Sequence, residues 1–243
     1  MDWHALALAC RRANASYVET GVASKAAFGA LGDAWIGQYA DRSHQATLSV
    51  DPLGQTWLSI SGTRASQLQV GDILRDVDLS PVAVNDGHVT AGASQGMDRV
   101  FDWARSTAPA GTVFQIVGHS LGAVSATLAP GYLPASQIGT ITSLAAPKFI
   151  AADFFASHAE VFKRLIALVS GSDGWSSWPW FDPRWQYRAP VPTVWLKDDR
   201  GTFAVLSDGN QWKGGWAFED HDIGSYQKRL DVIAAASDIK PAA

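Results

Sequence analysis

Hydrophobic and polar positions follow two different periods along the first quarter of the chain. Apolar residues recur at helical spacing over residues 3–31, which predicts two helices packed across a sheet, the second beginning with Ser24 as its N-cap. Residues 45–50 and 56–61 alternate instead, and the Asp-Pro-Leu-Gly sequence between them is typical of a turn. We therefore expect a β-hairpin after the N-terminal helices.

The rest of the chain alternates short apolar runs with amphipathic stretches. The pattern predicts strands at 113–117, 138–145 and 164–169, a short edge strand or strand end at 88–92, a hairpin of 194–196 with 203–206, and helices at 94–107, 123–129, 153–162 and 221–236. Strands that alternate with helices are typical of a sheet covered by helices on both faces. The prediction is one α/β domain over residues 1–243, with a mixed, mostly parallel sheet.

One strand leads directly into the sequence Gly118-His119-Ser120-Leu121-Gly122, with a small-residue helix behind it. This is the G-x-S-x-G pattern of the α/β-hydrolase nucleophile elbow, in which a serine occupies a strained turn and the flanking glycines leave room for the strand and the helix. His119 is expected to pack under the turn or to hydrogen bond locally. The alternative is a chance pentapeptide in a glycine-rich chain.

A serine nucleophile needs a base and an acid that orients the base, and in this fold they follow the serine in the order acid, then histidine. Two histidines follow Ser120, and we favour His221 over His158 because His221 comes after the last strands. The alternative for His221 is a surface residue that caps the final helix. Asp173 follows a strand end, where catalytic groups gather. The competing acids are Asp153, Asp182, Asp198, Asp199 and Asp208.

Two further features bear on a site. Gly62-Thr63 ends a strand upstream of the elbow, where this fold places its second oxyanion element, although an ordinary turn would have the same sequence. The segment 175–193 directly follows Asp173 and is rich in tryptophan. Trp175, Trp178 and Trp180 are therefore candidates for an apolar substrate wall, and core packing beneath a long loop is the alternative.

Composition excludes several other classes of protein. The net charge of −4 gives no basic footprint for nucleic acid, and no run is long enough for a transmembrane helix. The single cysteine, Cys10, allows no internal disulfide, and no metal-ligand or nucleotide-binding pattern is present, so no cofactor is expected. The first residues do not resemble a secretory signal. This predicts a protein that stays inside the cell, leaves it without a cleavable signal, or is represented by its mature form.

Several motifs together resemble the class 3 lipases, the fungal triacylglycerol lipase type. The resemblance runs from about residue 45 to residue 226 and is carried by the following segments: Ser61-Gly62-Thr63, Asp72-Ile73-Leu74-Arg75-Asp76-Val77, the elbow with Ala126-Thr127-Leu128, Ala146-Pro147-Lys148, Asp173 with Pro179, and His221 with Tyr226. One departure is that Arg64 follows Gly62-Thr63, whereas the family's arginine precedes the glycine.

The resemblance implies a serine esterase whose triad is Ser120, Asp173 and His221. Backbone N–H groups of Thr63 and Leu121 would then form the oxyanion hole, and residues 64–78 would be the lid. The implied substrate is a small-molecule or lipid ester, with transient contact at a lipid interface left open. A phospholipase or an acyltransferase would use the same triad, and a non-catalytic binding module on this fold is a further alternative.

Overall fold

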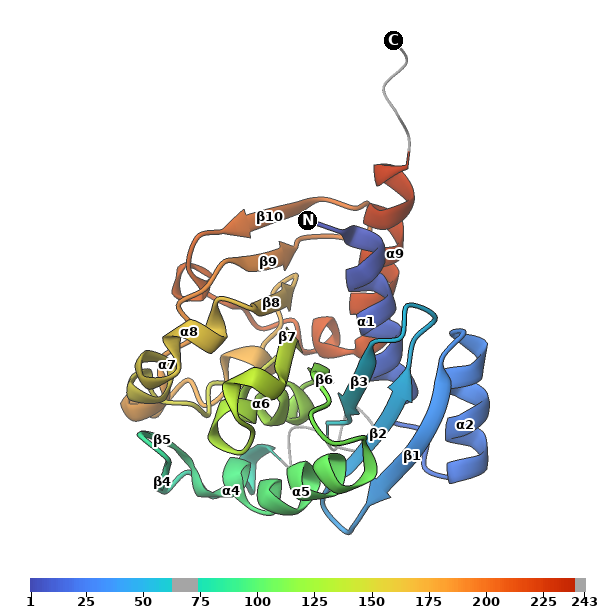
Figure 1. Ribbon diagram of the computed structural model, residues 1–243. Helices are drawn as coiled ribbons and strands as arrows, with labels where there is room; N and C mark the ends of the chain where they lie inside the picture. The colour runs from blue at the N-terminus through green and yellow to red at the C-terminus, as the bar shows by residue number, and fades with distance from the viewer. Residues whose placement is uncertain (63–73, 239–243) are drawn as a thin grey trace.

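A central sheet of eight strands runs through the computed structural model, which describes residues 1–62 and 74–238 (Figure 1). The strands, in their order across the sheet, are β1 (Ala34–Ala40), β2 (Gln45–Val50), β3 (Thr56–Ile60), β6 (Phe114–His119), β7 (Ile138–Leu144), β8 (Leu165–Ser170), β9 (Thr193–Leu196) and β10 (Phe203–Leu206). From β3 to β9 the neighbours are parallel, whereas β1, β2 and β10 add to the edges antiparallel. The predicted mixed, mostly parallel sheet is confirmed.

The helices flank this sheet. They are α1 (Trp3–Ala15), α2 (Gly21–Ala30), α4 (Ala91–Ser94), α5 (Met97–Thr107), α6 (Leu121–Thr127), α7 (Ala152–Ser157), α8 (Ala159–Phe162) and α9 (Ile223–Ser237). One-turn 3₁₀ helices lie at η1 (Ala129–Gly131), η2 (Ala135–Gln137), η3 (Trp175–Ser177), η4 (Pro183–Trp185), η5 (Gly209–Gln211) and η6 (Phe218–His221). Within residues 1–62 and 74–238, every helix is too short or too polar to cross a bilayer.

Each face of the sheet carries its own hydrophobic core. The helices α1 and α9 lie side by side on one face, where Leu6 and Leu230 belong to the same cluster as Val117 of β6. On the other face, which α5, α6 and α7 cover, Ile116 of β6 joins Phe101 and a larger apolar cluster. Neighbouring residues of one strand thus enter opposite cores. This explains why the sequences of the parallel strands are continuously apolar and do not alternate between apolar and polar residues.

A buried ion pair ties α1 to the sheet. Arg12 donates two hydrogen bonds of 2.7 Å to the carboxylate of Asp33, which directly precedes β1. The guanidinium also lies 4.3 Å from the ring centroid of Trp57 on β3. Because both charged groups are removed from water, each depends on the other for compensation. This contact fixes the C-terminal half of α1 over the strands that lead to the candidate site.

The second N-terminal helix begins earlier than predicted. Its N-cap is Thr20, which has an extended backbone and whose side-chain oxygen accepts the N–H of Ala23 at 3.3 Å. The prediction of Ser24 as the cap was therefore wrong. Ser24 is buried inside the helix, where its hydroxyl accepts the indole N–H of Trp35 at 3.3 Å. Both residues carry a hydroxyl, and the sequence pattern did not distinguish a cap from a buried polar contact.

The structure differs from the prediction at three other places. Strand β1 was not predicted, because it is a half-buried edge strand without clear alternation. The strand predicted at 88–92 corresponds to β5 (Gly87–Thr90), which pairs with β4 (Pro81–Val84) in a separate two-stranded sheet, not at the edge of the main sheet. The helix predicted at 153–162 is interrupted at His158, whose φ of −112° and ψ of 22° are not helical.

Candidate active site

Ser120 occupies a strained turn between β6 and α6. Its φ of 59° and ψ of −126° lie outside the regions that a residue with a side chain favours, at a cost of about 1–3 kcal/mol. The turn is tight enough to exclude side chains on both sides. A Cβ on Gly118 would lie 2.0 Å from the Gly122 carbonyl oxygen, and one on Gly122 would lie 2.2 Å from the Ile60 oxygen. The two glycines therefore let helix and strand approach closely enough to hold the serine at the tip.

The structure brings Ser120, His221 and Asp173 into one hydrogen-bonded chain. His221 Nε2 lies 2.8 Å from Ser120 Oγ, and its Nδ1 lies 3.0 Å and 2.9 Å from the two carboxylate oxygens of Asp173. A carboxylate only accepts, so Nδ1 carries the proton and donates it, which leaves Nε2 free to accept from the Ser120 hydroxyl. All three side chains are buried. The arrangement is that of a nucleophile, a base and an orienting acid.

The Asp173 carboxylate is held by donors besides the imidazole. Ser176 donates from both its backbone N–H, at 3.0 Å, and its hydroxyl, and Tyr226 of α9 donates its hydroxyl at 3.0 Å. Burial by itself would raise the pKa of Asp173, but His221 and the Ser176 donors outweigh it and keep the pKa below 3.8. Burial raises the pKa of Tyr226 well above 10.0, so this hydroxyl remains a donor. Asp173 therefore stays ionised beside the base.

A second network positions His221 at the end of η6. Arg229 of α9 donates to Asp220, the residue before His221, at 2.6 Å, and also to the Ser170 hydroxyl at the end of β8. A backbone bridge joins Asp173 to Ala217, at the start of the same turn. His221 and Asp173 are thus fixed to each other through the main chain as well as through their side chains.

His119 makes contacts that the sequence did not reveal. Its Nε2 lies 2.8 Å from the carbonyl oxygen of His221 and its Nδ1 lies 2.8 Å from the Tyr17 hydroxyl. A carbonyl can only accept, so Nε2 donates to it and Nδ1 accepts from Tyr17. Burial lowers the pKa of His119 to about 3, which keeps the ring neutral. His119 was expected to pack under the turn or to hydrogen bond locally, and the hydrogen bonds that it forms go to partners distant in the sequence.

The oxyanion side of the site is described in part. Thr63 and residues 64–73 of the expected lid lie outside the described residues. Gly62 is described, and a Cβ there would lie 2.9 Å from the Cβ of Ser120, so the strand end adjoins the nucleophile. Within residues 1–62 and 74–238, the N–H of Leu121 donates no hydrogen bond. This N–H, at the start of α6 directly after Ser120, is available to a developing negative charge.

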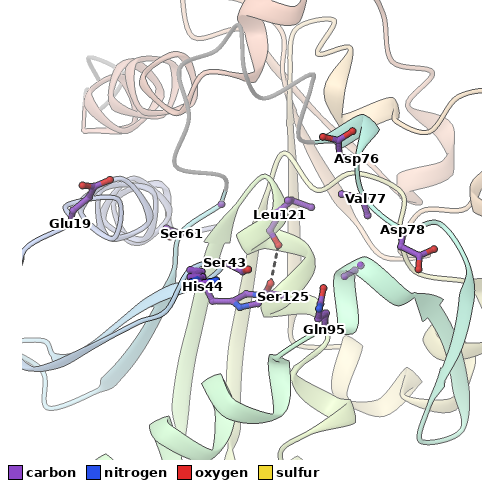
Figure 2. Close-up of a pocket in the computed structure, with 14 residues that line it drawn as sticks. Glu19, Ser43, His44, Ser61, Asp76, Val77, Asp78, Gln95, Leu121 and Ser125 are labelled. Carbon is purple, nitrogen blue, oxygen red and sulfur yellow. Dashed lines mark hydrogen bonds between the residues drawn. The ribbon is translucent and has the colours of Figure 1, made fainter.

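A cavity of about 720 Å³ opens beside Leu121 (Figure 2). Its described lining carries slightly more polar than apolar surface, and the polar side chains are those of Glu19, Arg42, Ser43, His44, Asp76, Asp78, Gln95 and Ser125. Figure 2 shows Leu121 and Ser125 on α6 in the centre of the view, with the Ser125 hydroxyl donating to the Leu121 carbonyl at 3.0 Å. The cavity is also lined by Gly62 at the strand end, which adjoins Ser120.

The tryptophan-rich segment begins next to the triad, since Ser176 binds Asp173. Trp175 and Trp178 are buried in the larger core cluster, and the Trp178 indole N–H donates to the Leu74 carbonyl at 3.0 Å. Trp180 is 36% exposed, and its ring centroid lies 4.6 Å from that of Trp178. Core packing accounts for the first two rings, and the role of all three as a substrate wall stays a prediction.

The other candidate residues lie elsewhere. His158 packs its ring against Phe154, with the centroids 4.6 Å apart, between α7 and α8. Asp153 pairs with His88 at 2.6 Å. The remaining carboxylates bind nearby cations or turn amides: Asp182, Asp198, Asp199 and Asp208. Within the part of the chain that the structure describes, no three His, Cys, Asp or Glu side chains are grouped so as to hold a metal ion.

Several solved structures with a similar fold are fungal lipases. Lip2 lipase from Yarrowia lipolytica is 17% identical over 95% of this chain and 90% of its own, with a TM-score of 0.67. Lipase II from Rhizopus niveus is 13% identical, covers 90% and 92% of the two chains and gives 0.69. The triacylglyceride lipase of Rhizomucor miehei is 16% identical, covers 93% and 96%, and gives 0.64. No protein-family model and no curated protein sequence matches the chain. The likeness confirms the α/β-hydrolase fold that the sequence resemblance implied.

Proposed function

We propose that this protein is a serine carboxylic-ester hydrolase that works through an acyl-enzyme. The observation that carries the proposal is the continuous hydrogen-bonded chain from Ser120 through His221 to Asp173, on a nucleophile elbow. The fold shared with triacylglycerol lipases supports the same reaction class. A neutral imidazole that accepts from Ser120 and donates to an ionised Asp173 is the state that general-base catalysis needs.

The reaction follows from these protonation states. Ser120 Oγ attacks the ester carbonyl carbon while His221 Nε2 takes the hydroxyl proton, and Asp173 stabilises the imidazolium that forms. As the tetrahedral intermediate collapses, the bond to the alcohol oxygen breaks and His221 gives that oxygen its proton. Water then attacks the acyl carbon and leaves its proton on His221. The bond to Ser120 Oγ breaks, Oγ takes the proton, and the carboxylic acid is released.

The Leu121 N–H is suited to bind the negative oxygen of both tetrahedral intermediates, because it stands at the N-terminus of α6 and donates elsewhere to no described residue. The N–H of Thr63 is the second donor in the proposal. One donor of this kind lowers the barrier by about 3–4 kcal/mol. Both groups are backbone amides, so substitution of their own side chains would not remove them.

The polar cavity beside Leu121 bears on the substrate. Its carboxylates, arginine and amide suit an alcohol portion with hydroxyl or charged groups, such as the free hydroxyls of a partial glyceride. A fully esterified glyceride would leave these polar walls without partners. The proposal is therefore that esters with a polar alcohol side are hydrolysed faster than triacylglycerols of the same acyl chain. Equal rates on monoacylglycerol and triacylglycerol would contradict it.

An exposed aromatic face supports transient contact with a lipid surface. Phe181 is 60% exposed and Trp216 is 67% exposed, and the Trp216 ring centroid lies 4.9 Å from that of Trp180. Aromatic side chains of this kind favour the boundary between water and lipid. The double substitution Phe181→Ala, Trp216→Ala should slow hydrolysis of an emulsified lipid ester but not of a soluble butyrate ester. An equal loss on both substrates would argue against lipid contact.

The decisive test is Ser120→Ala. It should lower the hydrolysis of p-nitrophenyl esters by at least about 10⁴-fold and abolish labelling by a fluorophosphonate, with the circular dichroism spectrum unchanged. The matched control is Ser106→Ala on α5, at an exposed serine whose hydroxyl bonds its own helix, and it should retain activity and labelling. Ester turnover that survives Ser120→Ala would refute the proposal. Product analysis with an added alcohol then separates hydrolysis from acyl transfer.

A further inference from the structure

A second, smaller cavity lies on the face of the sheet opposite α1 and α9. Two cations, Lys148 and Arg188, line it together. Lys148 follows β7 and Arg188 lies in the tryptophan-rich segment, so two separate chain segments bring their positive charges to one place. Burial and the charge of Arg188 lower the pKa of Lys148 to about 8. The two positive charges are therefore close enough to repel each other.

The two cations have no carboxylate of the described residues in direct contact, although the charge of Asp173 acts on Arg188 and partly offsets the lowering of its pKa by burial. Within residues 1–62 and 74–238, neither forms an ion pair with a carboxylate. Lys148 Nζ donates to the side-chain oxygen of Gln186, and the Arg188 guanidinium donates to the Ser176 carbonyl and lies 4.5 Å from the Trp212 ring centroid. All of these partners are neutral. Both residues are half-buried, and two neighbouring positive charges beside one cavity favour an anion between them.

The remainder of the cavity lining is mostly apolar. Phe155, Leu165 and Val169 contribute to its walls, and its volume is about 50 Å³. One water needs roughly 10–15 Å³, so the space admits a group of a few heavy atoms and excludes a long acyl chain. An inorganic ion such as phosphate would leave several oxygens against hydrocarbon. A carboxylate with a short alkyl group matches both the cations and the apolar walls.

From this geometry we infer that the Lys148–Arg188 cavity binds a short-chain carboxylate, with the carboxylate on the two cations and the alkyl group on the apolar walls. The site is distinct from the polar cavity beside Leu121, since the two share no lining residue. One residue connects the Lys148–Arg188 cavity with Asp173. The Ser176 carbonyl accepts from the Arg188 guanidinium, and the Ser176 N–H donates to the Asp173 carboxylate. The ligand can come from ester hydrolysis or from solution, and binding does not depend on the protein's own activity.

Thermal unfolding measures this binding, because a ligand that binds the native state raises the Tm. Sodium butyrate up to about 50 mM should raise the Tm, whereas butyramide, its neutral counterpart, and sodium chloride at equal ionic strength should not. Lys148→Met removes the charge and keeps the chain length, and should weaken the apparent affinity for butyrate at least about tenfold. The control is Lys163→Met on α8, an exposed lysine paired with Glu160, which should bind butyrate as the unaltered protein does.

A measurement on the unaltered protein covers the case in which Lys148→Met does not fold. Trace acetylation followed by mass spectrometry should show that butyrate slows modification of Lys148 and leaves Lys163 unaffected. Butyramide should protect neither lysine. The inference is overturned if butyrate gives no Tm rise, if chloride or butyramide gives the same rise, if Lys148→Met keeps the rise, or if Lys148 is not protected. Acetate and hexanoate added to the series distinguish a short alkyl pocket from a general anion site.

Discussion

Replacement of His119 by glutamine should flatten the dependence of stability on pH. The buried His119 ring is neutral because its Nε2–H donates to the His221 carbonyl and its Nδ1 accepts from Tyr17. Burial lowers its pKa from 6.5 to about 3. A glutamine amide can still donate to the carbonyl but does not titrate. The substitution thus removes a proton-linked contribution while it keeps part of the hydrogen bonding.

The sign and the size of this contribution follow from linkage. Between pH 6.5 and about 3 the unfolded state binds the His119 proton and the native state does not, so stability falls as the pH falls through this window. The slope reaches about 1.4 kcal/mol per pH unit, and the whole window corresponds to at most about 5 kcal/mol. That is comparable with the entire stability of many domains. Above pH 6.5 the contribution is complete.

Urea unfolding followed by circular dichroism, from about pH 8 to about pH 4.5, measures the effect. The unfolding free energy of the unaltered protein should fall more steeply below pH 6.5 than that of His119→Gln, by up to about 1.4 kcal/mol per unit. At high pH the variant should be less stable by about 0.5–1.5 kcal/mol, since the Tyr17 hydroxyl loses its acceptor. Tyr17→Phe keeps the imidazole and should keep the steep slope. Parallel curves for the unaltered protein and His119→Gln would refute the reasoning.

Three further substitutions test the site and its support. Asp173→Asn should lower kcat on p-nitrophenyl esters by about 10⁴-fold, because an amide cannot hold the imidazole in the tautomer that accepts from the serine; a loss below tenfold would contradict this. Gly62→Ala should impair activity, since its Cβ would lie 2.9 Å from the Cβ of the nucleophile, and normal kcat/KM would show that the strand end can move away. Asp33→Asn should destabilise the protein by about 3–5 kcal/mol in urea unfolding, because it leaves Arg12 buried without its main partner, and an unchanged midpoint would refute that cost.

Much of the fold was predictable because its signals are local. The elbow strand β6, strands β7 and β8, and the β2–β3 and β9–β10 hairpins carry apolar runs or turn sequences that few other structures would produce. Strand β1 was not predictable in this way, because an edge strand with both faces half exposed needs no regular pattern. The separate β4–β5 pair was misplaced for a related reason: a short strand pattern does not say which sheet the strand joins.

In the candidate site too, residues with local sequence signals were predictable and residues without them were not. Ser120, Asp173 and His221 could be proposed from one motif, from strand ends and from chain order, and the structure brings their side chains together. The residues that hold them could not be proposed from spacing. Tyr17 lies 102 residues before His119, and Arg229 acts on His221 through a neighbouring side chain. Contacts of this kind depend on how helices pack on the sheet, which no local pattern encodes.

The layer formed by α1 and α9 therefore does more than cover the sheet. Tyr226 of α9 donates to the carboxylate of Asp173, and Tyr17, just beyond the end of α1, donates to the His119 ring, which itself binds the backbone of His221. One tyrosine on α9 and one just beyond α1 thus support the surroundings of His221. The strained elbow persists only if its surroundings fix it, and these two hydroxyls are part of that support. A change in how α1 packs against α9 should therefore affect ester turnover before it affects the sheet, since the sheet has a second core on its opposite face.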